Sequence, residues 1–336
     1  MFATLKDVEI AAKADIIPSQ THINFATERQ GQLTKPQASL GKLETIAIWL
    51  AGWQKTQTPR LNKVDTLIFA GNHGVTKHGV SLFPAEVTAQ MVGNFETGGA
   101  AINQLCKLNG ANLKVMALDL DRPTADFTRA AAMNELEFLT AINVGANAIA
   151  ADADMITLGE MGIGNTTSAS AITLALFGGS ATDWTGSGTG LADEAIGKKA
   201  EIIQQSVAFH ADYKHQPLEV LRRLGGRELA AIFGATLAAR AKNIPVLLDG
   251  FICCAAVAPL FKLNENALSI ALAGHQSQEQ AHVKLLSALN LEPLLNLNMR
   301  LGEGSGAAVA LGIVQAAIHT HNGMATFAEA SVANKN

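Results

Sequence analysis

The chain of 336 residues contains little of several features that define other protein classes. It has one tyrosine, 5% aromatic residues, 16% charged residues and three cysteines, Cys106, Cys253 and Cys254. Three cysteines cannot build a disulfide framework, so we expect a reducing compartment and a cytoplasmic protein. The formal net charge is −4 and no run of Lys or Arg stands out. A nucleic-acid partner is therefore not expected, because tracking phosphates needs a clustered basic surface.

Long apolar runs are also missing. The first 15 residues lack the apolar core of a signal peptide, and later apolar stretches are interrupted by Gly, Asp or Asn before they reach membrane-spanning length. We therefore expect no membrane contact. The chain instead has 48% hydrophobic residues and 30 glycines, a mixture typical of helices packed on a buried parallel sheet.

Short apolar runs that end in glycine-rich turns alternate with Ala-rich stretches of helical length. The apolar runs are 64–70, 113–120, 155–158, 244–248 and 294–299, and the helical stretches are 84–108, 193–213, 228–242 and 306–320. This alternation predicts an α/β fold with a doubly wound parallel sheet. Ligands of such sheets bind beyond the carboxyl ends of the strands. Glycine-rich turns at that edge indicate a substrate that carries phosphate.

The first 60 residues have a different pattern. Residues 3–16 and 40–55 read as amphipathic helices, with Leu43, Ile46 and Leu50 at helical spacing, and a loop is expected between them. We expect a small helical domain made of residues 1–60 and about 320–336. Residues 61–319 would then form a large α/β catalytic domain.

The segment Gly159–Thr167 nearly matches the phosphate-binding P-loop pattern. Asn165 stands where that pattern has lysine, and without the ammonium group an NTPase is disfavoured. The backbone donors would still hold a monophosphate, with Thr166 and Thr167 as hydroxyl donors or as caps of the next helix. The alternative is a tight turn capped by threonine, which does not explain why Glu160 lies among the glycines.

Glu303 lies in the sequence Leu-Gly-Glu-Gly-Ser-Gly, between an apolar run and an Ala-rich helix. A carboxylate between glycines can point into a cleft, and an apolar cleft would raise its pKa and make it a better base near neutral pH. The alternative is that Glu303 only compensates the dipole of the following helix. Glu160 is a second candidate carboxylate with the same ambiguity.

No metal or cofactor is expected. His73 and His78 are not accompanied by an HExxH motif or a Cys/His quartet, and a structural role for His73 in its loop is favoured. The glycines of 302–306 do not match a dinucleotide-binding fingerprint. Ser277 is either a helix N-cap or a phosphate ligand.

Taken together, six segments resemble the nicotinate-nucleotide–dimethylbenzimidazole phosphoribosyltransferase family, in that family's order. They are 71–92, 159–170, 186–194, 247–256, 273–282 and 300–308. The resemblance implies a Rossmann-like parallel domain with a small helical domain, assembled as a homodimer. It also implies transfer of 5-phosphoribose from nicotinate mononucleotide to 5,6-dimethylbenzimidazole, for the lower ligand of cobalamin.

The resemblance also implies roles for individual residues. The catalytic residues are Glu303, which matches the family's catalytic carboxylate, and Glu160 and Lys199, at positions linked to the active site. The base pocket is formed by Ser81, Gln90 and Leu301. The segments that hold the mononucleotide contribute Gly162, Asn165, Thr166, Asp249, Gly250 and Ser277.

Two positions depart from the family's pattern. Asn72 stands where aspartate is common, and Gln276 where arginine is usual, so a charge is absent at each. Two alternatives stay open from the sequence. One is a non-catalytic nucleotide-binding protein, and the other is a phosphoribosyltransferase that uses a different aromatic base.

Overall fold

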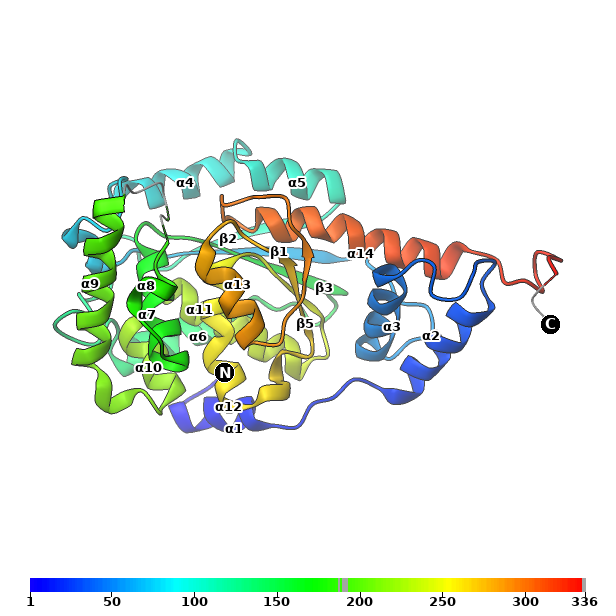
Figure 1. Cartoon of the computed structure of the whole chain (residues 1–336), viewed down its shortest axis with the longest axis horizontal. Helices are drawn as coiled ribbons and strands as arrows, with labels where there is room; N and C mark the ends of the chain where they lie inside the picture. Colours follow the sequence, from blue (N-terminus) through cyan, green and yellow to red (C-terminus); the bar gives the residue numbers. More distant parts are fainter. Residues whose placement is uncertain (187, 189–192, 334–336) are drawn as a thin grey trace.

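The computed structural model describes residues 1–186, 188 and 193–333. At its centre lies a parallel sheet with the strand order β2-β1-β3-β4-β5-β6 (Figure 1). The strands are β1 (Val64–Ala70), β2 (Asn112–Ala117), β3 (Met155–Met161), β4 (Val246–Leu248), β5 (Ala271–His275) and β6 (Pro293–Leu295). The strand order reverses between β1 and β3, where α/β sheets bind ligands. The predicted α/β fold with a parallel sheet is confirmed.

The central strands are buried on both faces. All seven residues of β1 are buried. Leu67 and Phe69 belong to one hydrophobic core, and Ile68, between them, belongs to another. Successive side chains of a strand point to opposite faces, so a sheet covered on both sides produces the continuous apolar run seen in the sequence.

Helices cover both faces of the sheet. The α-helices are α1 (Leu5–Lys13), α2 (Gln20–Gln32), α3 (Lys42–Gln54), α4 (Glu86–Thr97), α5 (Ala101–Asn109), α6 (Glu135–Ala148), α7 (Asn165–Phe177), α8 (Ala181–Trp184), α9 (Asp193–Phe209), α10 (Pro217–Leu224), α11 (Arg227–Ala241), α12 (Phe251–Leu263), α13 (Gln280–Ala288) and α14 (Ser305–Gly323). Helices α4, α5 and α14 lie on one face, and α11 and α12 pack on the other (Figure 1). Among the described residues, none of the helices is both long and apolar enough to cross a bilayer.

Three elements differ from the sequence-based expectation. The loop expected between the two N-terminal helices contains α2, and the stretch 84–108 is divided into α4 and α5 at Gly98 and Gly99. Strand β5 was not predicted, because its sequence Ala-Leu-Ala-Gly-His has no β-branched residue. Helix α2 has a polar sequence without a clear apolar stripe, and it packs on α3. Its stability therefore comes from this tertiary contact.

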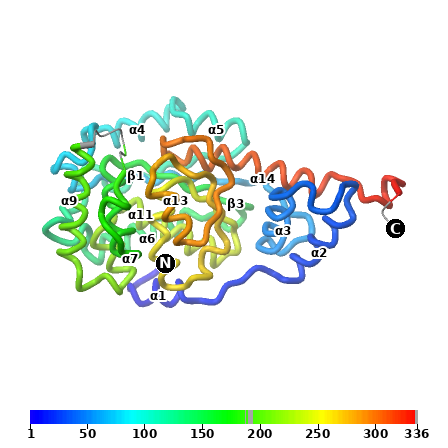
Figure 2. Tube along the Cα trace, viewed as in Figure 1, coloured from blue at the N-terminus to red at the C-terminus, as the bar shows by residue number. Residues whose placement is uncertain are grey.

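Helices α2 and α3 and the distal end of α14 form a separate lobe, at the right of Figures 1 and 2. Arg29 donates hydrogen bonds to the carbonyl oxygens of His321 (2.8 Å) and Asn322 (3.2 Å), which ties α2 to the end of α14. Helix α1 instead packs against α11 and α12. The domain division at residue 60 stays a prediction, and α1 lies with the large domain.

Arg240 of α11 joins this helix to the end of α1. It is fully buried and donates hydrogen bonds to the carbonyl oxygens of Ala11, Ala12 and Ala14. These carbonyls belong to the C-terminal end of α1, which has no intrahelical donors for them. We expect Arg240→Met to lower the free energy of unfolding by about 2–3 kcal/mol, because hydrogen bonds to a charged group are lost. Chemical denaturation measures this, with the exposed Arg129→Met as control. An equal effect of both substitutions would contradict the proposed role.

Candidate functional site

A cavity of about 650 Å³ lies at the carboxyl ends of β3, β4 and β5. Its wall contains residues from the segments 83–91, 160–166, 250–252, 275–279 and 300–303. These segments are far apart in the sequence, and each of them belongs to one of the six motifs singled out there. Of the remaining motif, 186–194, only Gly188 is placed in the wall, and residues 187 and 189–192 lie outside the described residues.

Glu303 lines this cavity and is only 8% exposed. It has a φ of 61°, between Gly302 at 80° and Gly304 at 76°, so a left-handed turn directs the side chain before α14 begins at Ser305. Burial, and secondarily the charge of Asp249, raise the pKa of Glu303 above its usual value. A buried carboxylate with a raised pKa is suited to accept a proton near neutral pH.

Glu160, at the end of β3, lies beside the Glu303 turn. A Cβ atom on Gly302 would be 2.7 Å from Glu160 Oε1, and Asn165 Nδ2 donates a hydrogen bond to Glu160 Oε2. Burial, followed by the charge of Asp249, raises the pKa of Glu160 to about 8. The carboxyl group therefore carries its proton at neutral pH. Asn165, at the lysine position of the P-loop pattern, contacts this carboxyl group.

Another part of the cavity wall is suited to an anion. Helix α7 begins at Asn165 and α12 at Phe251, and neither has a side-chain cap. Gly162, Thr166, Gly250 and Ser277 line the cavity near these helix starts. Free backbone N–H groups at a helix N-terminus favour a phosphate. Ser277 is not the N-cap of α13, because that position is Glu279; its hydroxyl accepts a hydrogen bond from the Glu279 amide.

Lys199 is nearly fully buried on α9, and its Nζ donates a hydrogen bond of 2.8 Å to Thr166 Oγ1. Burial lowers its pKa to about 8, and the charge of Glu279 opposes this shift. Lys199 is thus not a solvated neighbour of Lys198. It supplies a cation directly behind a hydroxyl group of the cavity wall.

Apolar side chains also line the cavity, and we call four of them its apolar wall. It is formed by Leu301 together with Phe83, Val87 and Met91. Leu301 is a residue that the sequence predicts for the base pocket, whereas the other three were not predicted, although they lie in the segment 71–92. Helical spacing is the signal that could have found Val87 and Met91, which are four residues apart on α4.

Besides Lys199, which lies behind Thr166, three predicted site residues do not line the cavity. Gln90 is exposed on α4 beside Val87, and Ser81 lies in the loop that leads to Phe83, in a shallow hollow next to the cavity. Asp249 is 1% exposed, and its carboxylate accepts hydrogen bonds from the backbone amides of Gly304 (3.1 Å) and Ala307 (2.9 Å).

The two histidines of the 71–92 segment have different partners. His73 is buried, with its Nε2 2.5 Å from Glu228 Oε1 and its Nδ1 3.0 Å from Ser168 Oγ. His78 lies 2.9 Å from Asp126. The two rings therefore do not converge on one point. No group of three potential metal ligands is found in the described ranges.

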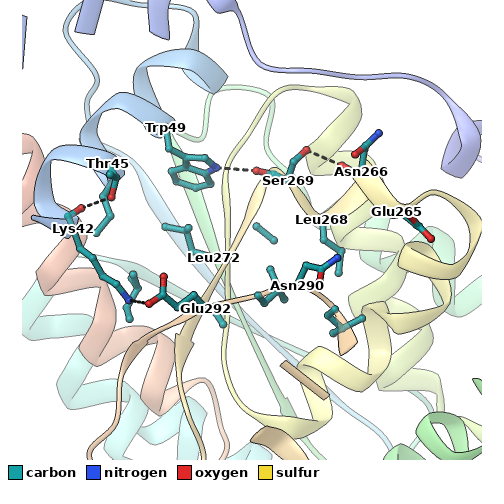
Figure 3. Close-up of a pocket in the computed structure, with 16 residues that line it drawn as sticks. Lys42, Thr45, Trp49, Glu265, Asn266, Leu268, Ser269, Leu272, Asn290 and Glu292 are labelled. Atoms are coloured by element: carbon teal, nitrogen blue, oxygen red, sulfur yellow. Dashed lines mark hydrogen bonds and ion pairs between the residues drawn. The ribbon is translucent and has the colours of Figure 1, made fainter. Parts of the chain in front are cut away.

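A second hollow, of about 470 Å³, lies at the opposite edge of the sheet (Figure 3). It separates α3 from the amino ends of β5 and β6. Trp49 donates a hydrogen bond of 2.8 Å to the Ser269 carbonyl, and Lys42 forms an ion pair of 2.7 Å with Glu292. Its wall contains no glycine-rich turn and no group of buried carboxylates. We therefore place the chemistry in the cavity that contains Glu303.

A comparison with known families now defines the class of protein. A phosphoribosyltransferase family model matches residues 17–332, and the parallel sheet with uncapped helix starts at its carboxyl edge agrees with it. The chain is therefore a phosphoribosyltransferase.

Individual relatives narrow this class. The chain is 54% identical over 334 residues to the nicotinate-nucleotide–dimethylbenzimidazole phosphoribosyltransferase of Mesorhizobium japonicum, covering 99% of each chain, and 56% identical to that of a Ruegeria species, covering 91% of each. The crystal structure of CobT from Thermus thermophilus superposes with a TM-score of 0.87 at 37% identity, covering 94% of this chain and all of that one. The chain belongs to the nicotinate-nucleotide–dimethylbenzimidazole phosphoribosyltransferase family.

Proposed function

We propose that the protein transfers 5-phosphoribose from nicotinate mononucleotide to 5,6-dimethylbenzimidazole. The products are α-ribazole 5′-phosphate and nicotinate, and the nucleotide serves as the lower ligand of cobalamin. The observation that carries this proposal is the position of Glu303, which is buried in a cavity that is lined by both apolar side chains and residues at two helix N-termini. This arrangement fits one apolar base and one phosphorylated substrate.

Glu303 acts as the general base. The pyridinium nitrogen of nicotinate mononucleotide is already positive, so nicotinate leaves readily. As the benzimidazole nitrogen attacks the anomeric carbon, the N–H on the other side of the azole becomes acidic, and Glu303 accepts that proton. Attack opposite to the leaving group converts a β-nucleotide into an α-nucleotide. General-base catalysis of this kind contributes about 10²- to 10⁴-fold in rate.

Glu160 supports this step in its neutral form. A pKa of about 8 leaves it protonated at neutral pH, so Glu160 does not add a second negative charge beside the Glu303 carboxylate. Its proton is also available for a hydrogen bond to a substrate oxygen. Two neighbouring carboxyl groups with different protonation states are typical of acid–base sites.

The mononucleotide's phosphate is held at the starts of α7 and α12. Gly162, Gly250 and Ser277 allow close approach and supply donors, and Thr166 presents a hydroxyl group backed by Lys199. Leu301 contacts the benzimidazole, and Ser81 and Gln90 contact it at the cavity mouth. We further propose that the protein works in the cytoplasm as a homodimer.

The experiment is to incubate the protein with nicotinate mononucleotide, with and without dimethylbenzimidazole, and to separate the products by chromatography. We expect nicotinate and an α-ribotide only when both substrates are present. Binding of the mononucleotide without any release of nicotinate would instead indicate a non-catalytic nucleotide-binding protein. Replacing dimethylbenzimidazole by adenine or unsubstituted benzimidazole tests the choice of base. An apolar pocket distinguishes one methyl group by only about 1–3 kcal/mol.

A further inference from the structure

A buried carboxylate outside the cavity wall contacts the turn that carries Glu303. Asp249 directly follows β4, and both of its oxygens are used by this turn: Oδ2 accepts a hydrogen bond from the Gly304 amide and Oδ1 accepts one from the Ala307 amide. Gly304 is the residue after Glu303, and Ala307 lies in the first turn of α14. Asp249 therefore holds the backbone on the C-terminal side of Glu303.

The turn needs such support because its conformation is unfavourable for glutamate. Three consecutive residues, Gly302, Glu303 and Gly304, have φ values of 80°, 61° and 76°. A residue other than glycine in this left-handed region costs about 1–3 kcal/mol, and it persists only where surrounding contacts maintain it. One such contact is within the turn, where Ser305 Oγ donates a hydrogen bond of 2.7 Å to the Gly302 carbonyl. The contact that joins the turn to β4 is Asp249.

The neighbouring strands leave the turn little space to move. A Cβ atom on Gly159 of β3 would lie 2.5 Å from the Gly304 nitrogen, and one on Gly274 of β5 would lie 2.8 Å from the Ala307 Cα. Both distances are shorter than any van der Waals contact, so the turn touches the backbone of both strands. Asp249, from the strand between them, then fixes the turn by hydrogen bonds.

We propose that Asp249 is a positioning residue for the transfer reaction, which directs the Glu303 carboxylate into the cavity through the amides of Gly304 and Ala307. This inference rests on the proposed function of Glu303. It gives Asp249 a role different from the mononucleotide contact that the sequence resemblance implies.

Charge supports the same role. The ionisable groups that line the cavity with Glu303 are Glu160 from β3, His275 at the end of β5, Glu279 before α13 and Arg300 before the turn, and Asp249 lies after β4. The charge of Asp249 adds to burial in raising the pKa of Glu303. His275 Nε2 lies 3.6 Å from Asp249 Oδ1. Burial raises the pKa of Asp249, and its hydrogen bonds from the backbone amides of Ala307 and Gly304 oppose that shift. A neutral side chain at position 249 would lower the pKa of Glu303.

The test is Asp249→Asn, assayed by nicotinate release at saturating concentrations of both substrates. Asparagine keeps the shape but offers only one acceptor oxygen to two amides. We expect kcat to fall on the order of 10- to 100-fold, because a small displacement of a catalytic group has an effect of this size. Both KM values should stay within about threefold, since no substrate contact is removed. The acid limb of the kcat–pH profile should move to lower pH.

Two controls separate this role from a general loss of structure. Asp65→Asn changes an equally buried aspartate at the amino edge of the sheet, where it pairs with Lys114, and it should leave kcat and the pH profile unchanged. The double variant Asp249→Asn with Glu303→Gln should be no slower than Glu303→Gln alone, because both changes act through one group. If the loss of kcat in the double variant equals the product of the two single losses, the residues act independently and the proposal is wrong.

Other outcomes are equally decisive. A rise of the mononucleotide KM by more than about tenfold at unchanged kcat would make Asp249 a substrate ligand. Because a buried substitution can prevent folding, Asp249→Ser is measured in parallel, since its smaller side chain leaves room for a water. If neither variant folds while Asp65→Asn does, Asp249 serves the fold and the proposal is wrong. If the wild-type protein itself releases no nicotinate, the proposed function is wrong, and this outcome differs from one in which only the Asp249 variants behave unexpectedly.

Discussion

We expect Glu303→Gln to lower kcat by about 10²- to 10⁴-fold, which corresponds to about 3–5 kcal/mol of transition-state stabilisation. The amide has the same shape as the carboxylate, so both substrates should still bind, but it cannot accept the azole proton. Wild-type kcat should decrease as the pH falls through the raised pKa of Glu303, because the base becomes protonated. The variant should lose this acid limb. Rapid quench or continuous measurement of nicotinate release provides both results.

A matched control is Glu292→Gln, which changes an exposed glutamate at the opposite edge of the sheet. It should have wild-type kcat. The alternative role for Glu303, compensation of the α14 dipole, predicts the reverse pattern: a loss of stability of about 0.3–1 kcal/mol with turnover retained. A Glu303→Gln protein with near wild-type kcat would therefore exclude the base mechanism.

Much of the fold could be predicted because two-sided burial leaves a clear pattern. The run 64–70 coincides with β1, and the stretch 228–242 coincides with α11 within one residue. The failures have a physical cause. Strand β5 consists mostly of small residues, since its neighbours approach closely at Gly274, and such a strand has no strong local propensity. Helix α2 depends on its contact with α3.

The residues of the candidate site also fall into two groups, those that the local sequence indicates and those that depend on tertiary contacts. Glu303, Glu160 and Thr166 lie in or beside glycine-rich segments that follow or end apolar runs, and the local sequence therefore indicates them. The role of Asp249 could not be predicted, because it depends on hydrogen bonds to a turn 55 residues away in the chain. Phe83 in the apolar wall was missed for a related reason. Its contribution depends on how the loop before α4 lies over the carboxyl edge of β3.

The second large effect is expected for Lys199→Met. The substitution keeps the length of the side chain but removes the cation behind Thr166. A hydrogen bond to a charged group is worth about 1.5–3 kcal/mol, so the KM for nicotinate mononucleotide should rise on the order of 10- to 100-fold. At saturating mononucleotide, kcat should change little, because the phosphate is remote from the reacting nitrogen. Initial rates over a range of mononucleotide concentrations measure both constants.

The pH dependence of the KM for nicotinate mononucleotide distinguishes phosphate binding by Lys199 from a role at the reacting centre. Burial lowers the pKa of Lys199 to about 8, and a bound phosphate favours the charged form and raises that pKa. The wild-type KM should therefore be constant below pH 8 and rise above it, by up to about tenfold per pH unit. In Lys199→Met the KM should be independent of pH over this range, even though Glu160 also titrates near pH 8. Lys198→Met is the matched control, because Lys198 is the exposed neighbour on the same helix and pairs with Glu194. A fall in kcat at unchanged KM would move Lys199 from the phosphate to the reacting centre.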